Sequence, residues 1–155
     1  MITQSPITNS QSQIPSWFSD LQQQAWQEFL NTPMPSRKDE TWRFSNMKQL
    51  DFEGYLDDTE SEIEYSIPEL PEGVVCLPLA EALQSHGDLV KEHFMKRETR
   101  LGSAKFTALH KARVKSGLFV YVPDGVRVEK PIEVSHVLSG TTTASFPHTL
   151  VITGK

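Results

Sequence analysis

The sequence has 155 residues, enough for one ordinary domain, and 23% of them are charged, which is typical of a soluble protein. Twenty acidic residues against fifteen basic ones give a net charge of −5, which disfavours a nucleic-acid-binding protein, because phosphate contacts require a basic surplus. No apolar run approaches the ~20 residues that span a membrane, and the single cysteine, Cys76, excludes an internal disulfide.

Residues 1–15 are predicted to form a disordered polar tail. Residues 1–19 carry no charge, and Ser, Thr, Gln and Pro interrupt every apolar stretch among them. A secretory signal needs a basic start and a continuous apolar stretch, and a mitochondrial presequence needs arginines. Together with the unpaired cysteine, which fits a reducing compartment, this favours a cytoplasmic protein.

Residues 16–31 predict the first helix. Leu21, Ala25 and Phe29 are four residues apart and therefore share one helical face, and Pro33 is expected to end the helix. We interpret this stripe as part of the core. A platform for an aromatic ligand is the weaker alternative.

Residues 35–44 follow as a turn and a short, highly charged stretch with two aromatic side chains. Arg37 and Glu40 are three residues apart and can pair on one helical turn. Trp42 and Phe44 are expected to tuck under the first helix. Nothing in this stretch has the spacing of a catalytic set.

Residues 51–72 hold nine carboxylates and no lysine or arginine. We interpret this segment as a solvated linker with little fixed structure. The alternative is an acidic docking strip or a divalent-metal site. A calcium loop, however, needs carboxylates at regular ligand spacing with a central glycine, and residues 57–60 do not supply that pattern.

The middle of the chain predicts a buried strand at 73–77, because this run is apolar and rich in β-branched residues. Two short helices are expected at 79–86 and 88–96, separated by Gly87. A further helix is expected at 103–114. Its basic side chains can meet an acidic partner surface or the acidic linker; in and just after the helix they are Lys105, Lys111, Arg113 and Lys115.

The pattern changes from helical to strand-like at residue 118. Short strands are predicted at 118–122 and 148–153 and, between these, on either side of a bend at Lys130-Pro131, around 126–128 and 132–134. Residues 123–125 are expected to form a Pro-Asp-Gly turn. Strands this short, joined by bends, favour the rungs of a solenoid over a meander of hairpins. The strand pattern is still running at Lys155, so we expect the chain to be part of a longer protein.

The candidate chemical groups favour structural roles. Cys76 alone cannot hold an iron–sulfur cluster, which needs several ligands, and in an apolar strand it behaves as a small hydrophobic residue. Zinc needs about four ligands, and the spacing of the five histidines does not provide them. We expect His110 on a solvated face. His136 and His148 are expected to be half-buried and bonded to backbone carbonyls.

Several blocks of the sequence, in the right order, resemble the SufD proteins of the SufB/SufD family. Residues 35–44 match the pattern P-x-R-x-x-E-x-W-[KR]-[YF]. Residues 105–132 contain the blocks that open the family's core, and residues 147–152 also fit, so the resemblance extends over about 17–152. The motif residues, which we expect to be structural, are Arg37, Glu40, Trp42, Phe106, Leu109, Gly117, Tyr121, Pro123, Gly125, Pro131 and His148.

The resemblance implies an α+β chain in three parts. These are the disordered tail at 1–15, an N-terminal helical domain at 16–100 that includes the acidic linker 51–72, and the first turns of a right-handed parallel β-helix at 101–155, truncated. It also implies a non-catalytic scaffold subunit of the SUF iron–sulfur cluster assembly machine, working with SufB and the ATPase SufC.

The regions that dock SufC and SufB in the family lie outside these positions, so no catalytic, cofactor-binding or metal-binding residue carries over. We therefore expect this chain to bind no cofactor by itself, the iron–sulfur cluster being handled by the full complex. It is expected to bind neither nucleic acid nor membrane and to self-associate through its open solenoid end.

Two alternatives from other classes stay open. The first is a self-standing β-solenoid binding module that presents Tyr121, Arg127 and residues 139–146 to a protein or carbohydrate ligand. The second and weaker one is an enzyme built on Cys76 and a histidine, for which no supporting spacing is present.

Overall fold

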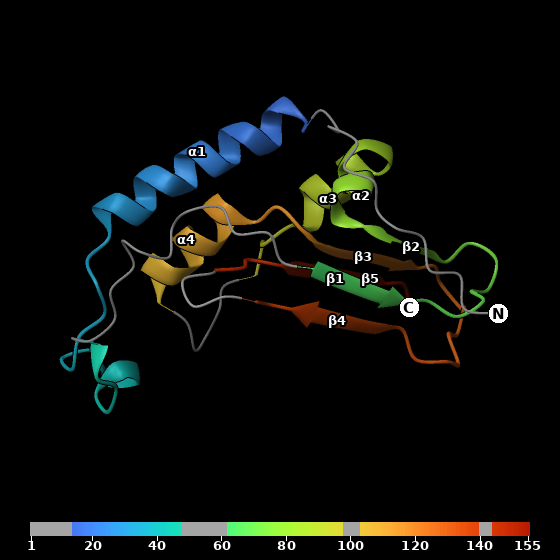
Figure 1. Cartoon of the computed structure of the whole chain (residues 1–155). Helices are drawn as coiled ribbons and strands as arrows, with labels where there is room; N and C mark the ends of the chain where they lie inside the picture. The colour runs from blue at the N-terminus through green and yellow to red at the C-terminus, as the bar shows by residue number, and fades with distance from the viewer. Residues whose placement is uncertain (1–13, 48–61, 98–102, 140–143) are drawn as a thin grey trace.

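The computed structural model describes residues 14–47, 62–97, 103–139 and 144–155. Helices and strands alternate irregularly along these residues (Figure 1). In chain order they are α1 (Ser16–Asn31), the 3₁₀ turn η1 (Glu40–Trp42), β1 (Glu62–Ser66), β2 (Val75–Pro78), α2 (Leu79–Ser85), α3 (Gly87–His93), α4 (Ala104–Arg113), β3 (Gly117–Val122), β4 (Glu133–Val137) and β5 (His148–Thr153).

The first helix has the predicted bounds, and it packs along α4 (Figure 1). Its buried side chains include Ala25 and Phe29 of the predicted stripe, which confirms that the stripe belongs to the core. Phe29 forms a small cluster with Leu109 of α4. The position of α1 along α4 is fixed by a hydrogen bond of 2.8 Å that Gln22 Nε2 donates to the carbonyl of Val114, just after α4 ends.

Two small sheets form the rest of the fold. In the first, β3 is central, with β2 antiparallel on one side and β5 parallel on the other. The second sheet consists of β1 and β4, which run antiparallel with Glu62 opposite Val137. The predicted strands at 73–77 and 118–122 are confirmed within two residues, and the one at 148–153 has its predicted bounds.

The prediction of a right-handed parallel β-helix over residues 101–155 is wrong. In a β-helix each strand pairs in parallel with a strand of the next turn, whereas among the described residues only β3 and β5 run parallel. Strands from earlier in the chain take the other pairing positions: β2 flanks β3, and β1 holds β4 in a separate sheet. The fold is α+β with two small sheets, so a β-solenoid binding module has no structural basis.

Part of the predicted acidic linker is also a strand. In β1 the carboxylates of Glu62 and Glu64 are exposed, while Ile63 and Tyr65 between them are half-buried. This two-residue alternation is that of a strand with one covered face. Tyr65 donates a hydrogen bond of 3.0 Å from its hydroxyl to the carbonyl of Gly117, which joins the two sheets.

Some parts of the predicted division into tail, helical domain and core lie outside the described residues. These are residues 1–13 of the tail, residues 51–61 of the acidic segment and the proposed boundary at residue 100. In the part of the chain that is described, no helix is long and apolar enough to cross a bilayer.

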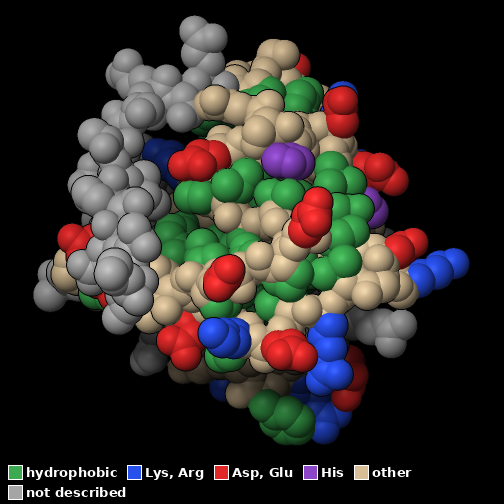
Figure 2. Space-filling model, turned by 90° about the vertical axis from the view of Figure 1, so that its right-hand side faces the viewer, with side chains coloured by type: hydrophobic (Ala, Val, Ile, Leu, Met, Phe, Trp, Pro, Cys, Tyr) green, Lys and Arg blue, Asp and Glu red, His purple; other side chains and the backbone are tan. Residues whose placement is uncertain are grey.

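The surface on the right-hand side of Figure 1 gathers hydrophobic side chains near its centre, with acidic side chains scattered among them (Figure 2). Among the described residues in and next to the strands, several large apolar side chains are exposed. Those between 40% and 56% exposed are Ile67, Val137, Leu138 and Val151.

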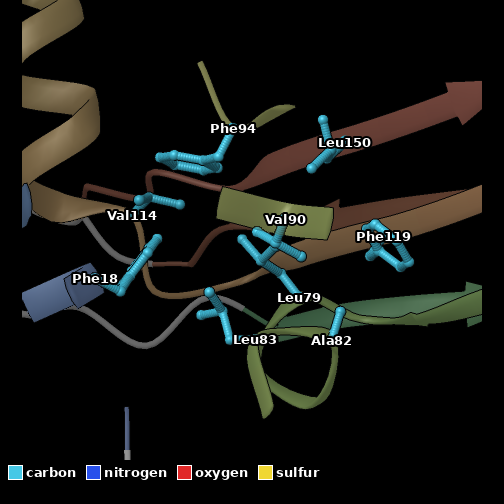
Figure 3. Packing of buried hydrophobic residues seen from close by; sticks show 9 residues of the cluster. All are labelled: Phe18, Leu79, Ala82, Leu83, Val90, Phe94, Val114, Phe119 and Leu150. Atoms are coloured by element: carbon cyan, nitrogen blue, oxygen red, sulfur yellow. The ribbon is translucent and has the colours of Figure 1, made fainter. Parts of the chain in front are cut away.

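The main core lies between α2, α3 and the β3–β5 pair (Figure 3). Its nine buried residues are Phe18, Leu79, Ala82, Leu83, Val90, Phe94, Val114, Phe119 and Leu150. Phe18 reaches this core from the start of α1 and meets Phe94 edge to face, with ring centroids 5.3 Å apart. Each large side chain buried in this way contributes about 1.5–3 kcal/mol to folding, so this cluster positions the helices on the sheet.

Candidate functional site

The motif block at residues 35–44 contacts the block at residues 105–132 through aromatic side chains. Trp42, at the end of η1, packs against Phe106 of α4 with ring centroids 5.5 Å apart. Glu40 pairs with Arg43 at 3.3 Å, a different partner from the expected Arg37. Phe44 was predicted to tuck under the first helix, but it is 88% exposed.

Gly117 and His148 are opposite each other in the parallel β3–β5 pair. Gly117 has φ +137°, and a Cβ atom at this position would clash with the carbonyl of His148. The backbone N–H of His148 donates a hydrogen bond of 2.9 Å to the carbonyl of Ser116. A glycine is therefore what allows the two strands to begin side by side.

This pairing brings together two histidines that are 38 residues apart in the sequence. His110 Nε2 on α4 lies 3.2 Å from His148 Nδ1 at the start of β5, within hydrogen-bond distance. The ring of Phe94 covers His148, with centroids 4.7 Å apart. These two imidazoles, held by three separate segments, are the candidate functional site.

The surroundings keep both imidazoles neutral. Burial lowers the pKa of His110 below its usual value. Burial, together with the charge of His110 when protonated, lowers the pKa of His148 to about 4. At neutral pH, one ring therefore donates the shared hydrogen bond and the other accepts it.

The structure corrects part of the sequence-based placement of the histidines. His148 is half-buried, as predicted, but its ring meets another imidazole. His110 is also half-buried, which contradicts the expected solvated face. His136 is exposed on β4, where a half-buried position was predicted, because β4 belongs to the two-stranded sheet and has only β1 beside it.

The remaining motif residues hold local structure. At the turn that follows β3, the N–H of Val126 donates to the carbonyl of Pro123, and Gly125 adopts φ +71°. Tyr121 packs against the main core rather than lying free for a ligand. Leu109 is buried under α1, and Pro131 is exposed just before β4.

Cys76 is half-buried in β2, opposite Val120. Burial raises the pKa of its thiol, so the thiol form is favoured at neutral pH. Tyr65 also has a raised pKa, first because of burial and then because of the nearby Cys76 and Glu81. These surroundings do not activate a nucleophile, which leaves the alternative of a cysteine enzyme without support.

Within the described residues, no group of three or more His, Cys, Asp and Glu side chains is arranged to hold a metal ion. The chemistry that the site does offer is that of two neutral imidazole nitrogens facing each other. The sequence did not predict this pair. The four-residue spacing of Phe106 and His110 places both on one face of the helix, but it does not indicate which residue of another segment contacts His110.

Comparison with known proteins places this fold in context. A family described as "SufBD protein N-terminal region" matches residues 55–134. The "Iron-sulfur cluster assembly protein SufD" of Bacillus subtilis is 30% identical over an alignment of 172 positions, which covers 90% of this chain and 39% of that protein.

Two other relatives match over a shorter part. An "Iron-sulfur cluster assembly SufBD family protein" of Pyrococcus horikoshii is 34% identical over 54% of this chain and 18% of its own length. The "Iron-sulfur cluster assembly protein SufB" of Bacillus subtilis is 33% identical over 52% of this chain and 17% of its own length. The chain thus spans about two fifths of the first relative and under a fifth of the other two.

Proposed function

The chain belongs to the SufB/SufD family, and from this premise we propose that it is part of a SufD-type scaffold subunit for iron–sulfur cluster assembly. The observation that carries the proposal is the extent of the match to SufD, 90% of this chain, against 52% for SufB. A match of that extent takes in α1 and the segment around Trp42, the region in which the sequence resembles SufD.

The placement of the motif residues supports a scaffold role rather than catalysis. Trp42 packs on Phe106, Gly117 lets β5 approach β3, and Tyr121 and Leu109 pack into the two cores. These residues hold elements in place and do not surround a reacting group. A subunit that works by presenting surfaces to partners needs this kind of rigid framework.

The exposed surface supports a protein partner. Hydrophobic side chains with acidic ones among them gather near the centre of the face shown in Figure 2, and a chain with net charge −5 is poorly suited to nucleic acid. On this proposal the whole protein works in the cytoplasm with SufB and SufC and does not itself catalyse a reaction. The iron–sulfur cluster is the cargo of the complete assembly.

Complementation tests the proposal. The complete gene whose product contains this chain would be expressed in bacteria that depend on the SUF system and lack either sufD or sufB. We expect growth under iron limitation to return in the sufD deletion only, and SufB and SufC of the same source to co-purify with the tagged protein.

Paired variants show whether the motif framework matters. Trp42→Ala removes the contact with Phe106, whereas Phe44→Ala changes a neighbouring aromatic side chain that is exposed. We expect the first to weaken rescue and the second to retain it. Rescue of the sufB deletion instead, or of neither deletion by a folded and expressed protein, would contradict the proposal.

A further inference from the structure

The separation of the two imidazole nitrogens is that of two ligands on one metal ion. Nitrogen ligands lie about 2.0–2.1 Å from zinc, so two of them at a tetrahedral angle are about 3.3 Å apart. His110 Nε2 and His148 Nδ1 are 3.2 Å apart. We propose that His110 and His148 form a two-imidazole site for a borderline divalent transition-metal ion such as Zn²⁺ or Cu²⁺.

The segments that carry the two rings are fixed in place before any ion arrives, so each ring needs only to turn its nitrogen towards the ion. His110 is carried by α4, and the backbone of His148 is fixed by its hydrogen bond to Ser116. The ring of Phe94 packs against the His148 ring and limits its rotation. Because little side-chain freedom remains to be lost, binding costs less entropy than it would for two mobile surface histidines.

The hydrogen bond between the rings shows how their nitrogens can serve an ion. Imidazole binds metals through a ring nitrogen that carries no proton, and one nitrogen of each ring already faces the other ring at 3.2 Å. On binding, the ring that donates the shared hydrogen bond moves its proton to its other nitrogen. Both rings stay neutral, so no net proton is released. Both are only half-buried, which lets water complete the coordination sphere.

The ligand type sets the class of ion. Imidazole nitrogens suit copper, zinc and nickel, whereas magnesium and calcium require oxygen ligands. Two protein ligands make a weaker site than the three or four of catalytic and structural zinc centres, so binding is expected to be reversible. This inference does not rest on the proposed function, and a failure of one leaves the other standing.

Zinc titration with matched variants is the first test. Zinc chloride would be titrated into the protein by calorimetry at pH 7 in a buffer that does not bind metals. We expect one saturable site that His110→Gln and His148→Gln each weaken by at least about tenfold, since glutamine can still hydrogen-bond but binds zinc poorly. His136→Gln, at an exposed histidine on β4, should leave the affinity unchanged.

Nitrogen-detected NMR of the histidine rings in the unmodified protein is the second test and does not depend on variants that fold. Zinc should shift His110 Nε2 and His148 Nδ1 together and leave the ring of His136 unmoved. The proposal is overturned if the unmodified protein does not bind zinc, if either glutamine variant binds as tightly as the original, or if the shifts fall on other histidines.

Discussion

Lys105 Nζ donates hydrogen bonds of 2.7 Å to the backbone carbonyls of both Phe29 and Thr32. The ammonium group also lies 4.3 Å from the centre of the Phe29 ring. A side chain of α4 thus caps the carboxyl end of α1, where helix carbonyls lack intrahelical partners and the helix dipole favours a cation. Lys105 therefore holds α4 against the end of α1, whereas the sequence suggested a contact with an acidic partner surface or with the acidic linker.

Replacing Lys105 should weaken the packing of α1 against α4. Lys105→Met keeps the aliphatic stem but removes both hydrogen bonds, and we expect it to lower the free energy of unfolding by about 1–2 kcal/mol. Urea denaturation followed by circular dichroism measures this. Lys111→Met, on the same helix, is the matched control and should change stability by less than about 0.5 kcal/mol. Equal effects from the two variants would show that the cap contributes nothing specific.

Gly117→Ala should be among the most damaging single changes. The new Cβ would meet the His148 carbonyl in a backbone conformation that alanine rarely adopts, so we expect a loss of roughly 2–4 kcal/mol or failure to fold. Gly87→Ala is the control, because its added Cβ would have no atom within 4 Å apart from its chain neighbours and the backbone of its own helix, and the site begins α3. Thermal melts compare the two. A Gly117→Ala protein as stable as the original would refute the close approach of β3 and β5.

The histidine pair should make the fold sensitive to acid. His148 has its pKa lowered from 6.5 to about 4 in the folded protein, so the unfolded chain binds more protons between these values. The corresponding stability is fully present above pH 6.5 and is lost as the pH falls towards 4. Allowing for solvent screening of a half-exposed ring, we expect a loss of roughly 1–2 kcal/mol between pH 7 and pH 4.5.

Denaturation curves at the two pH values, recorded with a chelator present, measure this loss. His148→Gln should make it smaller, while His93→Gln, which alters an exposed histidine, should not. If His148→Gln leaves the pH dependence intact, another group is responsible for it.

Cys76 should react slowly with thiol reagents. Burial raises its pKa, so little thiolate is present at pH 7, and the side chain is partly covered in β2. We expect labelling of the folded protein to be at least about tenfold slower than labelling in urea. Because the sequence contains one cysteine, all specific labelling comes from Cys76, and the Cys76→Ala variant measures the background labelling. Rapid labelling of the folded chain would instead indicate an accessible, activated thiol.

The sequence alone was sufficient for the local elements whose pattern is complete within a few residues. The apolar stripe and the prolines that follow it predicted α1 at its observed bounds, and the run at 148–153 predicted β5. The turn at Pro123 followed from its residue types. Several motif blocks in the right order were also enough to identify the family. Each of these local structures depends on neighbouring positions and the family match on the order of the motif blocks, and the sequence displays both directly.

Only the tertiary structure decided which strands pair and which polar groups meet. β1 was hidden in an acidic segment, because its charged residues mask a two-residue alternation that becomes meaningful only beside β4. The same holds for Lys105 on the end of α1 and for His110 beside His148, contacts that span 73–76 and 38 residues. Such contacts depend on the free energy of the whole packed chain, and no local pattern records them.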